Sequence, residues 1–402
     1  MQQATLRQDA RVIGLVGLAH GVSHFYHLIL AAVFPWLKPA FGLSYAELGL
    51  LMTVFFVISG VGQVLAGFVV DRVGATRVLI GGLVLLAIAA LVLAGAQGYP
   101  MLMFGSLIAG LGNSVFHPAD YTLLNQRVSK ARLAHGFSVH GISGNLGWAA
   151  APLFLGGVAA ASSWRMAVLV SAALPVLMLL LIFFNRAYLR ADPVAPKAAG
   201  PAPEASLAFL RLPTVWMCFG FFFLSSIALG GIQSFASTSL VALYQVSLAS
   251  ATTAYTAYML ASAGGMVAGG FIAARALNHD RTIVIAFALA AGLALLLALA
   301  VAPGWMVIPL MGAVGLASGV AGPSRDLLIR GAAPANATGR VFGVVYSGLD
   351  SGLAVGPLLF GALMDAHHPS WVFVCIGLFQ ALSIVTVVGI KGGRHAPALQ
   401  KA

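Results

Sequence analysis

Long, nearly uninterrupted apolar runs fill this chain and leave few folds open to it. A helix needs about 20 apolar residues to cross the ~30 Å hydrocarbon core of a bilayer, and about twelve runs reach that length. We expect membrane-spanning helices near residues 12–37, 45–70, 78–97, 101–125, 135–160, 165–185, 213–243, 249–274, 282–302, 305–329, 340–364 and 371–390. Charged residues make up 8% of the 402 residues and hydrophobic residues 60%, so polar groups are too few to cover a water-soluble surface. The sequence therefore predicts an all-α integral membrane protein with twelve transmembrane helices.

The positive charges follow a membrane topology. The net charge is +11, with 21 Lys and Arg. Lys38 and Arg165 fall on one side of the predicted spans and Arg325 lies within a span, whereas the rest fall on the opposite side. Basic loops mark the cytoplasmic side, so we expect both termini in the cytoplasm and the chain in a bacterial inner membrane. The lipid bilayer explains the charge, and we expect no nucleic-acid partner.

The chain repeats itself at an offset of 205 residues. Four identical pairs follow this offset, namely Pro118 and Pro323, Phe137 and Phe342, Gly147 and Gly352, and Pro152 and Pro357. A proline-rich, charged stretch between Asn185 and Pro213 separates the two copies. We therefore expect an N-terminal six-helix half over 1–188, a cytoplasmic linker over 189–212 and a C-terminal six-helix half over 213–402.

The first predicted span carries a polar stripe of His20, Ser23, His24 and His27. This spacing places the four side chains on one helix face, which should meet a cavity or another helix rather than lipid. The histidines could bond to neighbouring backbone or serine, could handle protons near neutral pH, or could ligate a metal through the i, i+4 pair His20 and His24. No carboxylate or cysteine accompanies the stripe, so we expect no resident metal and no cofactor.

The junction between the second and third predicted spans carries a compact charged motif of Gly67, Asp71, Arg72, Gly74 and Arg77. A tight turn with topogenic charges would account for the arginines but not for the aspartate and the glycines. The motif resembles motif A of the major facilitator superfamily, whose members are transporters with twelve helices in two pseudo-symmetric halves. The resemblance implies that this loop latches the two halves at the cytoplasmic face.

The repeat aligns Asp120 with Arg325, and Asn145 with Asp350. The resemblance implies that the helices carrying Asp120 and Arg325 line a central cavity. We hypothesise that these two side chains pair across the halves when the cytoplasmic gate is shut. The alternative is that each is satisfied within its own half, for instance Arg325 by Asp326.

Asp350 lies about 15 Å along its helix from the basic end at Arg340, and so near the bilayer midplane. An ionised carboxylate is costly at that depth, so we expect a proton or a nearby cation to neutralise it. Asp350 is the first candidate for the coupling proton, followed by His24 and His117. A structural role, accepting a bond from Tyr346, is the alternative. No nucleotide-binding motif occurs in the sequence, which argues against ATP-driven transport.

Residues 141–144 spell Gly-Ile-Ser-Gly, the GxSG of intramembrane serine proteases. A serine nucleophile needs a histidine base within hydrogen-bond reach, whereas glycine-rich segments are common wherever helices meet in membranes. Twelve spans are also too many for that fold. We expect no enzymatic activity, and an intramembrane serine hydrolase is a remote alternative.

A closer resemblance lies on the fourth and fifth predicted spans. Ser-x-Phe-His-Pro over residues 114–118 precedes Gly-Asn-x-Gly over residues 144–147, a combination similar to the fosmidomycin-resistance branch of the superfamily. Members of that branch commonly carry Glu directly after His-Pro, where this chain has Ala119. The resemblance implies the fold and transport, and the departure leaves the solute open.

We therefore predict a monomeric secondary transporter of a small anionic or zwitterionic organic solute or drug, coupled to protons, favouring efflux and working by rocking of the halves. The expected solute-binding residues are His20, His24, His27, His117, His140, Asn145, Arg325 and Tyr346. The expected gating residues are Asp71, Arg72, Arg77, Asp120, Arg325 and Asp326. Uptake of an organic anion is one alternative, and transport of a metal or metal chelate by the His20, His24 and His27 stripe is another.

Overall fold

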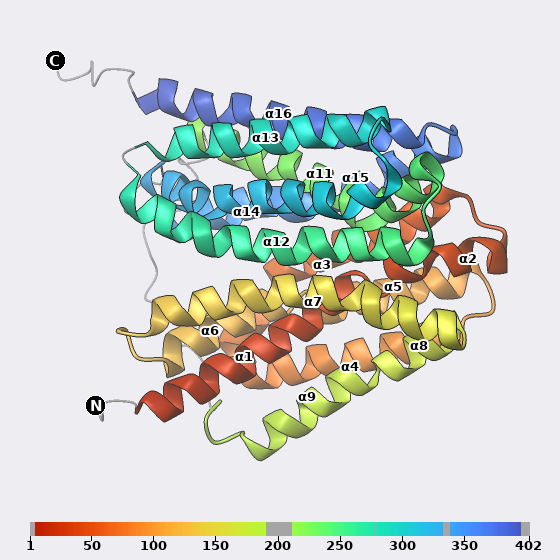
Figure 1. Ribbon diagram of the computed structural model, residues 1–402. Helices are drawn as coiled ribbons and strands as arrows, with labels where there is room; N and C mark the ends of the chain where they lie inside the picture. Colours follow the sequence, from red (N-terminus) through yellow and green to blue (C-terminus); the bar gives the residue numbers. More distant parts are fainter. Residues whose placement is uncertain (1–4, 190–210, 277, 333–337, 395–402) are drawn as a thin grey trace. The chain divides into compact units, whose positions relative to one another are not determined.

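The computed structural model describes residues 5–189, 211–276, 278–332 and 338–394. These residues form helices and the loops between them, and no strand occurs within these ranges. The chain divides into two compact units, Met1–Lys197 and Ala198–Ala402, which Figure 1 colours from red to yellow-green and from green to blue. The division falls inside the linker expected over 189–212.

Unit 1 contains the helices of the first half. They are α1 (Leu6–His27), η1 (Ala31–Val33), α2 (Phe34–Phe41), α3 (Tyr45–Val73), α4 (Ala75–Ala94), α5 (Tyr99–Asn113), α6 (Phe116–Arg127), α7 (Leu133–Ala161), α8 (Trp164–Ser171) and α9 (Ala173–Phe184). Unit 2 contains those of the second half. They are α11 (Pro213–Tyr244), α12 (Leu248–Arg275), α13 (His279–Leu299), η3 (Gly304–Met306), α14 (Val307–Ala332), α15 (Thr338–Asp365) and α16 (Pro369–Arg394).

The described helices supply the expected spans. Eleven are long and apolar enough to cross a membrane, with α5–α6 and α8–α9 each counted as one span. A twelfth is formed by α1 together with Ala31–Phe41, two segments that bend by 46° at their break. Each range expected from the sequence coincides with one of these spans. The prediction of an all-α, multi-pass membrane protein is confirmed, although the sequence did not predict the bend.

Prolines mark two breaks beside polar residues. Pro35 lies in the first turn of α2, where a backbone N–H would have no helical partner in any case. Pro118 lies in the first turn of α6, directly after the break at Ser114 and Val115. A proline inside a helix removes one backbone hydrogen bond and clashes with the preceding turn, so the span Tyr99–Arg127 is interrupted there.

In the charged motif between α3 and α4, the backbone conformation at position 74 requires glycine. Gly74 has a φ of 92°, which strains any residue with a side chain. Asp71 and Arg72, in the last turn of α3, are exposed. Arg77 is also exposed and donates a hydrogen bond from Nη1 to Val73 O at 3.3 Å. The turn therefore presents three charged side chains to the surroundings of unit 1.

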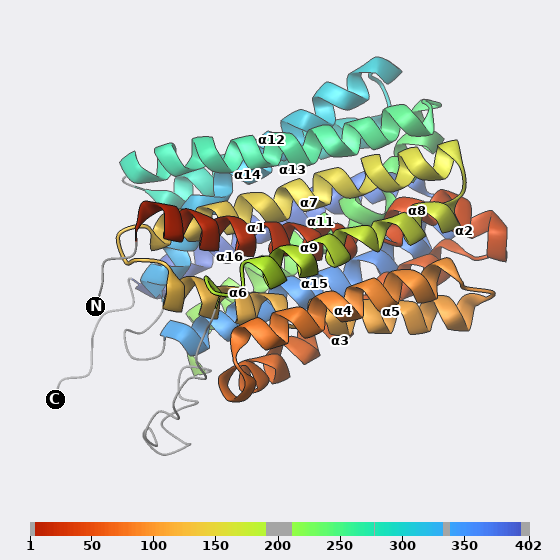
Figure 2. The ribbon, with the colours of Figure 1, turned by 90° about the horizontal axis from the view of Figure 1, so that it is seen from below.

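Helices α1 and α7 approach each other closely. A Cβ added at Gly147 would lie 2.2 Å from Gly21 O, and one added at Gly21 would lie 3.2 Å from Ser143 O. Small residues allow helix backbones to pack this tightly in membranes. Figures 1 and 2 show α1 running beside α7, and α1 also contacts α6. The polar stripe of α1 is consequently buried against α6 and α7.

Candidate functional site

His27, the last histidine of the stripe, is hydrogen-bonded through both ring nitrogens. Trp148 Nε1, on α7, donates to Nδ1 at 3.2 Å. Because an indole N–H can only donate, Nδ1 is unprotonated and Nε2 carries the ring hydrogen. Nε2 in turn donates to Asn113 Oδ1 at 3.1 Å. These two bonds hold His27 as a neutral imidazole in one tautomer.

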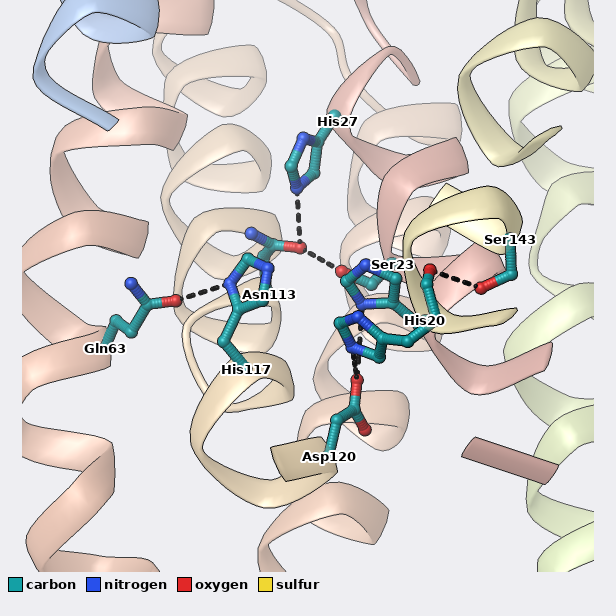
Figure 3. A network of polar contacts seen from close by, with 9 residues as sticks. His20, Ser23, His27, Gln63, Asn113, His117, Asp120 and Ser143 are labelled. Carbon is teal, nitrogen blue, oxygen red and sulfur yellow. Dashed lines mark hydrogen bonds and ion pairs between the residues drawn. The ribbon is translucent and has the colours of Figure 1, made fainter. Parts of the chain in front are cut away.

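Asn113, the last residue of α5, links α1 to α3. Its Oδ1 also accepts a bond from Ser23 Oγ at 2.5 Å, and its Nδ2 donates to Ser59 Oγ at 2.8 Å. Figure 3 shows His27 and Ser23 converging on the Asn113 side chain. All of these side chains are buried, and their mutual bonds position three helices without a ligand.

A carboxylate lies among histidines one turn away. Asp120, on α6, is fully buried, and its Oδ2 lies 3.1 Å from His140 Nε2 and 3.2 Å from His20 Nδ1. The His140 contact has hydrogen-bond geometry, whereas the His20 nitrogen lies within ion-pair distance but outside hydrogen-bond geometry. The His20 and His140 rings stack with their centroids 3.5 Å apart. Asp120 thus contacts α1 and α7 of its own unit.

His24 and His117 complete the cluster. His117 is half-buried, and its Nδ1 lies 2.7 Å from Gln63 Oε1 on α3 (Figure 3). The His24 ring is buried with its centroid 4.2 Å from that of His20 and 4.3 Å from that of Trp148. Neither ring nitrogen of His24 has a hydrogen-bond partner among the described residues. Buried polar atoms are nearly always bonded in folded proteins, so His24 needs an explanation.

Helix α7 makes room for the histidine rings with a glycine. A Cβ added at Gly144 would lie 2.6 Å from His24 Nδ1, 2.7 Å from His24 Cε1 and 3.1 Å from His20 Nε2. Any larger residue would push these rings aside. Glycine at position 144 is therefore part of the geometry of the cluster.

Two groups of side chains bring ligating atoms close enough to share a metal ion. They are His20, His24 and His117, and His20, Asp120 and His140. Within each group the ligating atoms lie within 4.8 Å of one another. In the sequence, no carboxylate or cysteine accompanies the stripe. The fold supplies a carboxylate from α6.

Unit 2 carries Arg325 and Asp350, which the repeat aligns with Asp120 and Asn145 of unit 1. Arg325, on α14, is half-buried, and its guanidinium carbon lies 4.8 Å from the centre of the Phe222 ring. Asp350 is half-buried near the middle of the 28-residue helix α15. The side chains of Asp326 and Tyr346 lie outside the described part of the structure.

Unit 2 also buries neutral polar side chains that the sequence reasoning missed. They are Gln233, Ser234, Tyr255 and Thr256. Their side-chain polar atoms have no hydrogen-bond partner within the described ranges. Ser237 Oγ on α11 donates to Ala251 O on α12 at 3.4 Å. Gln233 lies four residues before Ser237 on α11, and Tyr255 lies four residues after Ala251 on α12. Because the two helices run antiparallel, Gln233 and Tyr255 lie at a similar depth.

The family follows from two matches that together span most of the chain. The model of the Major Facilitator Superfamily matches residues 16–346 and, in a second match, residues 223–401. The chain belongs to the major facilitator superfamily. This is a family of membrane transporters, and the resemblance carried by residues 67–77 is confirmed.

Two relatives place this superfamily member more closely. It is 26% identical to the fosmidomycin resistance protein of Escherichia coli (strain K12) over 278 residues, which are 66% of this chain and 65% of that protein. It is 25% identical to a multidrug resistance protein B homologue of Mycobacterium tuberculosis (strain ATCC 25618 / H37Rv) over 178 residues, or 44% of this chain and 33% of that protein. The chain thus matches just under two thirds of the first relative and a third of the second. The expected nearness to the fosmidomycin-resistance branch is confirmed.

A solved structure shows the same superfamily fold. It is a bacterial homologue of the human lysosomal transporter Spinster, in an inward-facing and occupied conformation. The TM-score is 0.76 at 14% sequence identity, over 97% of each chain. At this identity the likeness concerns the fold alone, and it confirms the expected major facilitator architecture.

Five of the expected solute-binding residues of this superfamily member lie together in unit 1. They are His20, His24, His27, His117 and His140. Asn145, on the same helix as His140, donates from Nδ2 to Gly141 O at 3.2 Å. The sequence reasoning missed the partners contributed by other helices, which are Ser59, Gln63, Asn113 and Trp148. Ser59 and Gln63 repeat the i, i+4 polar spacing of the stripe, and that signal could have found them.

A second network, also missed, ties the start of α1 to the loop between α6 and α7. Asp9 is fully buried and accepts hydrogen bonds from Ser129 Oγ and Arg132 Nε, each at 2.6 Å. The Ser129 backbone N–H donates to the other carboxylate oxygen at 3.2 Å. This network fastens the three helices that carry the histidine cluster.

Proposed function

We propose that this superfamily member is a secondary transporter of a small organic solute that carries a negative charge or a zwitterionic group. The proposal rests on the half-buried guanidinium of Arg325, at the end of the span Gly304–Arg325 and before the end of helix α14. A charged side chain in a membrane span is costly and by default marks a substrate or ion path. A guanidinium fork matches the geometry of a carboxylate or phosphonate.

The solute also needs neutral hydrogen-bonding groups. Buried, unbonded polar atoms at Gln233 and Tyr255 of unit 2 would otherwise remain unsatisfied, at a cost of about 1–3 kcal/mol each. A hydroxyl or amide group on the solute would bond to them. In unit 1 the histidines and Asn145 are the further binding residues, and in unit 2 Tyr346 is one.

Export is the direction we propose. The relatives named above are resistance proteins, and moving a toxic compound out of the cell is the simplest route to resistance. Uptake of an organic anion is the alternative, because Ala119 occupies the position where the fosmidomycin-resistance branch commonly has Glu.

Proton coupling is assigned to Asp350. Its half-buried carboxylate lies on α15 inside the span Ser347–Asp365, where an ionised group is expensive and a bound proton would neutralise it. The sequence reasoning ranked His24 and His117 next. The absence of a nucleotide-binding motif from the sequence supports a gradient as the energy source.

Access would alternate by rocking of the two halves. The gate that we propose pairs Asp120 with Arg325, with Asp326 beside it, and stays a prediction. The exposed charges Asp71, Arg72 and Arg77 form the proposed latch at the cytoplasmic face. The chain would act as a monomer in a bacterial inner membrane, with both termini in the cytoplasm.

Transport is proposed in preference to hydrolysis. Ser143, in the Gly-Ile-Ser-Gly segment, donates its hydroxyl to the backbone carbonyl of His140 at 2.8 Å rather than to an imidazole nitrogen. A serine nucleophile requires a base on its hydroxyl. The bond to the carbonyl therefore favours a structural serine.

The experiment is counterflow in proteoliposomes with a panel of carboxylates, phosphonates and matched uncharged analogues. We expect exchange of at least one anionic solute and a loss of roughly 10-fold or more in Arg325→Gln, with partial rescue by Arg325→Lys. Arg281→Gln, an exposed arginine of the same unit, is the control. Undiminished exchange of anions by Arg325→Gln would refute the assignment of an anionic solute.

A further inference from the structure

We propose that His20, His24 and His117 bind one divalent transition-metal ion of the zinc class. One ring nitrogen from each lies within 4.8 Å of the others. Zinc holds imidazole nitrogens at 2.0–2.1 Å, which puts neighbouring ligands about 3.4 Å apart, so the ring nitrogens need to approach one another by up to about 1.4 Å. Two of these histidines come from one face of α1 and the third from the first turn of α6.

His24 is the side chain that points to a ligand. It is 8% exposed, and both ring nitrogens lack a hydrogen-bond partner among the described residues. An imidazole buried in this way loses its bonds to water and gains none in return. Coordination of a metal ion by one of the two nitrogens would satisfy that nitrogen.

One of the other two histidines, His117, is already oriented as metal ligands usually are. A ligating histidine normally bonds its second ring nitrogen to a carboxylate or another oxygen acceptor, which fixes the ring. His117 does so through Gln63 Oε1 at 2.7 Å. His20 Nδ1 lies within ion-pair distance of Asp120 Oδ2, at 3.2 Å, and its Nε2 lies beside Gly144, as His24 Nδ1 does. Figure 3 shows Gln63 beside His117 and Asp120 beside His20.

The remaining histidines are already committed to other bonds. His27 uses both nitrogens, one for Trp148 and one for Asn113. His140 bonds Asp120 through Nε2. The second possible group, which contains Asp120 and His140, is therefore joined without an ion, and the group around His24 is the better metal site.

The chemistry of the donors selects the ion. Three neutral imidazoles suit zinc, cobalt or nickel rather than magnesium or calcium, which prefer oxygen ligands. Three protein ligands leave a fourth position for water. The carboxylate of Asp120, 3.2 Å from His20 Nδ1, offsets part of the ion's charge.

The test measures binding at equilibrium, without a gradient. Full-length protein is purified in detergent without a histidine tag, stripped with a chelator and titrated with Co²⁺, and Zn²⁺ is then added to displace it. We expect one ion per chain, with the visible absorption of tetrahedral Co²⁺ lost on adding Zn²⁺. Transport is not measured, so failure of this test leaves the proposed transport intact, and failure of transport leaves this result intact.

Variants identify the ligands. His24→Ala should weaken Zn²⁺ binding by roughly 100-fold or more, and Gln63→Leu by roughly 10-fold to 100-fold, because the latter frees the His117 ring. His24→Cys keeps a zinc ligand and should add a thiolate-to-cobalt charge-transfer band, which shows a folded site that includes position 24. His135→Ala, an exposed histidine at the start of α7, should bind as the wild type does.

Three results would overturn the proposal. One is wild-type protein that takes up no Co²⁺ in tetrahedral form. Another is His24→Ala that binds as tightly as His135→Ala. The last is a pattern across three variants: His24→Ala still binds Co²⁺, His24→Cys binds it without a charge-transfer band, and His140→Ala does not bind it. That pattern would place the ion in the group around Asp120.

Discussion

Replacing Gly144 by alanine tests whether the histidine rings fill the space that α7 leaves open. The added Cβ would lie 2.6 Å from His24 Nδ1 and 2.7 Å from His24 Cε1. Ordinary contacts between such atoms are about 3.5 Å, so the ring must retreat by roughly 0.8 Å. The ring has little room to do so, since the ring centroids of His20 and Trp148 lie 4.2 and 4.3 Å away and the added Cβ would also lie 3.1 Å from His20 Nε2.

The magnitude follows from a matched control on the same helix. A Cβ at Gly156 meets nothing within 4 Å, so Gly156→Ala changes helix propensity alone. That change contributes up to about 1 kcal/mol in favour of alanine in both variants and cancels in the comparison. Overpacking typically costs about 1–3 kcal/mol, which is the expected difference in stability between Gly144→Ala and Gly156→Ala.

Thermal unfolding in one detergent, followed by tryptophan fluorescence, measures this difference. We expect Gly156→Ala to unfold at or above the wild-type temperature and Gly144→Ala below it. Because His24 is displaced, Zn²⁺ binding by Gly144→Ala should also fall by roughly 10-fold or more, as for loss of a supporting contact. Equal unfolding temperatures and equal Zn²⁺ affinities in the two variants would refute the geometry.

Three further changes test other parts of the structure. Asp350→Asn should abolish accumulation of solute driven by a pH gradient and preserve counterflow exchange, because it removes the proton carrier alone; gradient-driven accumulation at the wild-type level contradicts this. Asp9→Asn should destabilise the protein by about 1.5–3 kcal/mol, because Ser129 and the part-exposed Arg132 lose a charged acceptor, seen as a lower unfolding temperature than that of an exposed control, Arg281→Gln. Trp148→Phe should lower the free energy of unfolding by about 1–3 kcal/mol, since Nδ1 of His27 loses its hydrogen-bond donor. An unchanged unfolding temperature would argue against the assigned tautomer of His27.

The fold was predictable because each membrane span appears in the sequence as a continuous apolar run. Each span must be apolar over about 20 residues whatever its neighbours are, so the runs can be counted without knowing the packing. The break after His27 was less visible, since the apolar run continues through residues 28–37. Pro35 and Pro118 mark the breaks locally, but the 46° bend between α1 and Ala31–Phe41 depends on tertiary packing.

The candidate site was predictable only along one helix. Helical spacing correctly gathered His20, His24 and His27 on a single buried face. Which partner each one meets depends on how α3, α5, α6 and α7 pack against that face. The sequence argument against a metal required a carboxylate or cysteine near the stripe in the sequence. Asp120 lies about a hundred residues away in the chain and 3.2 Å away from His20 in space.

The stripe therefore contains histidines of different chemistry at successive turns of α1. His27 donates from one nitrogen and accepts at the other, so adding a proton or a metal ion would break its bond from Trp148. His24, one turn earlier, has no such bond to break within the described residues. Protons and metal ions would compete for His24 and leave His27 unchanged. Substitution of His27 should consequently lower stability, whereas substitution of His24 should change what the protein binds.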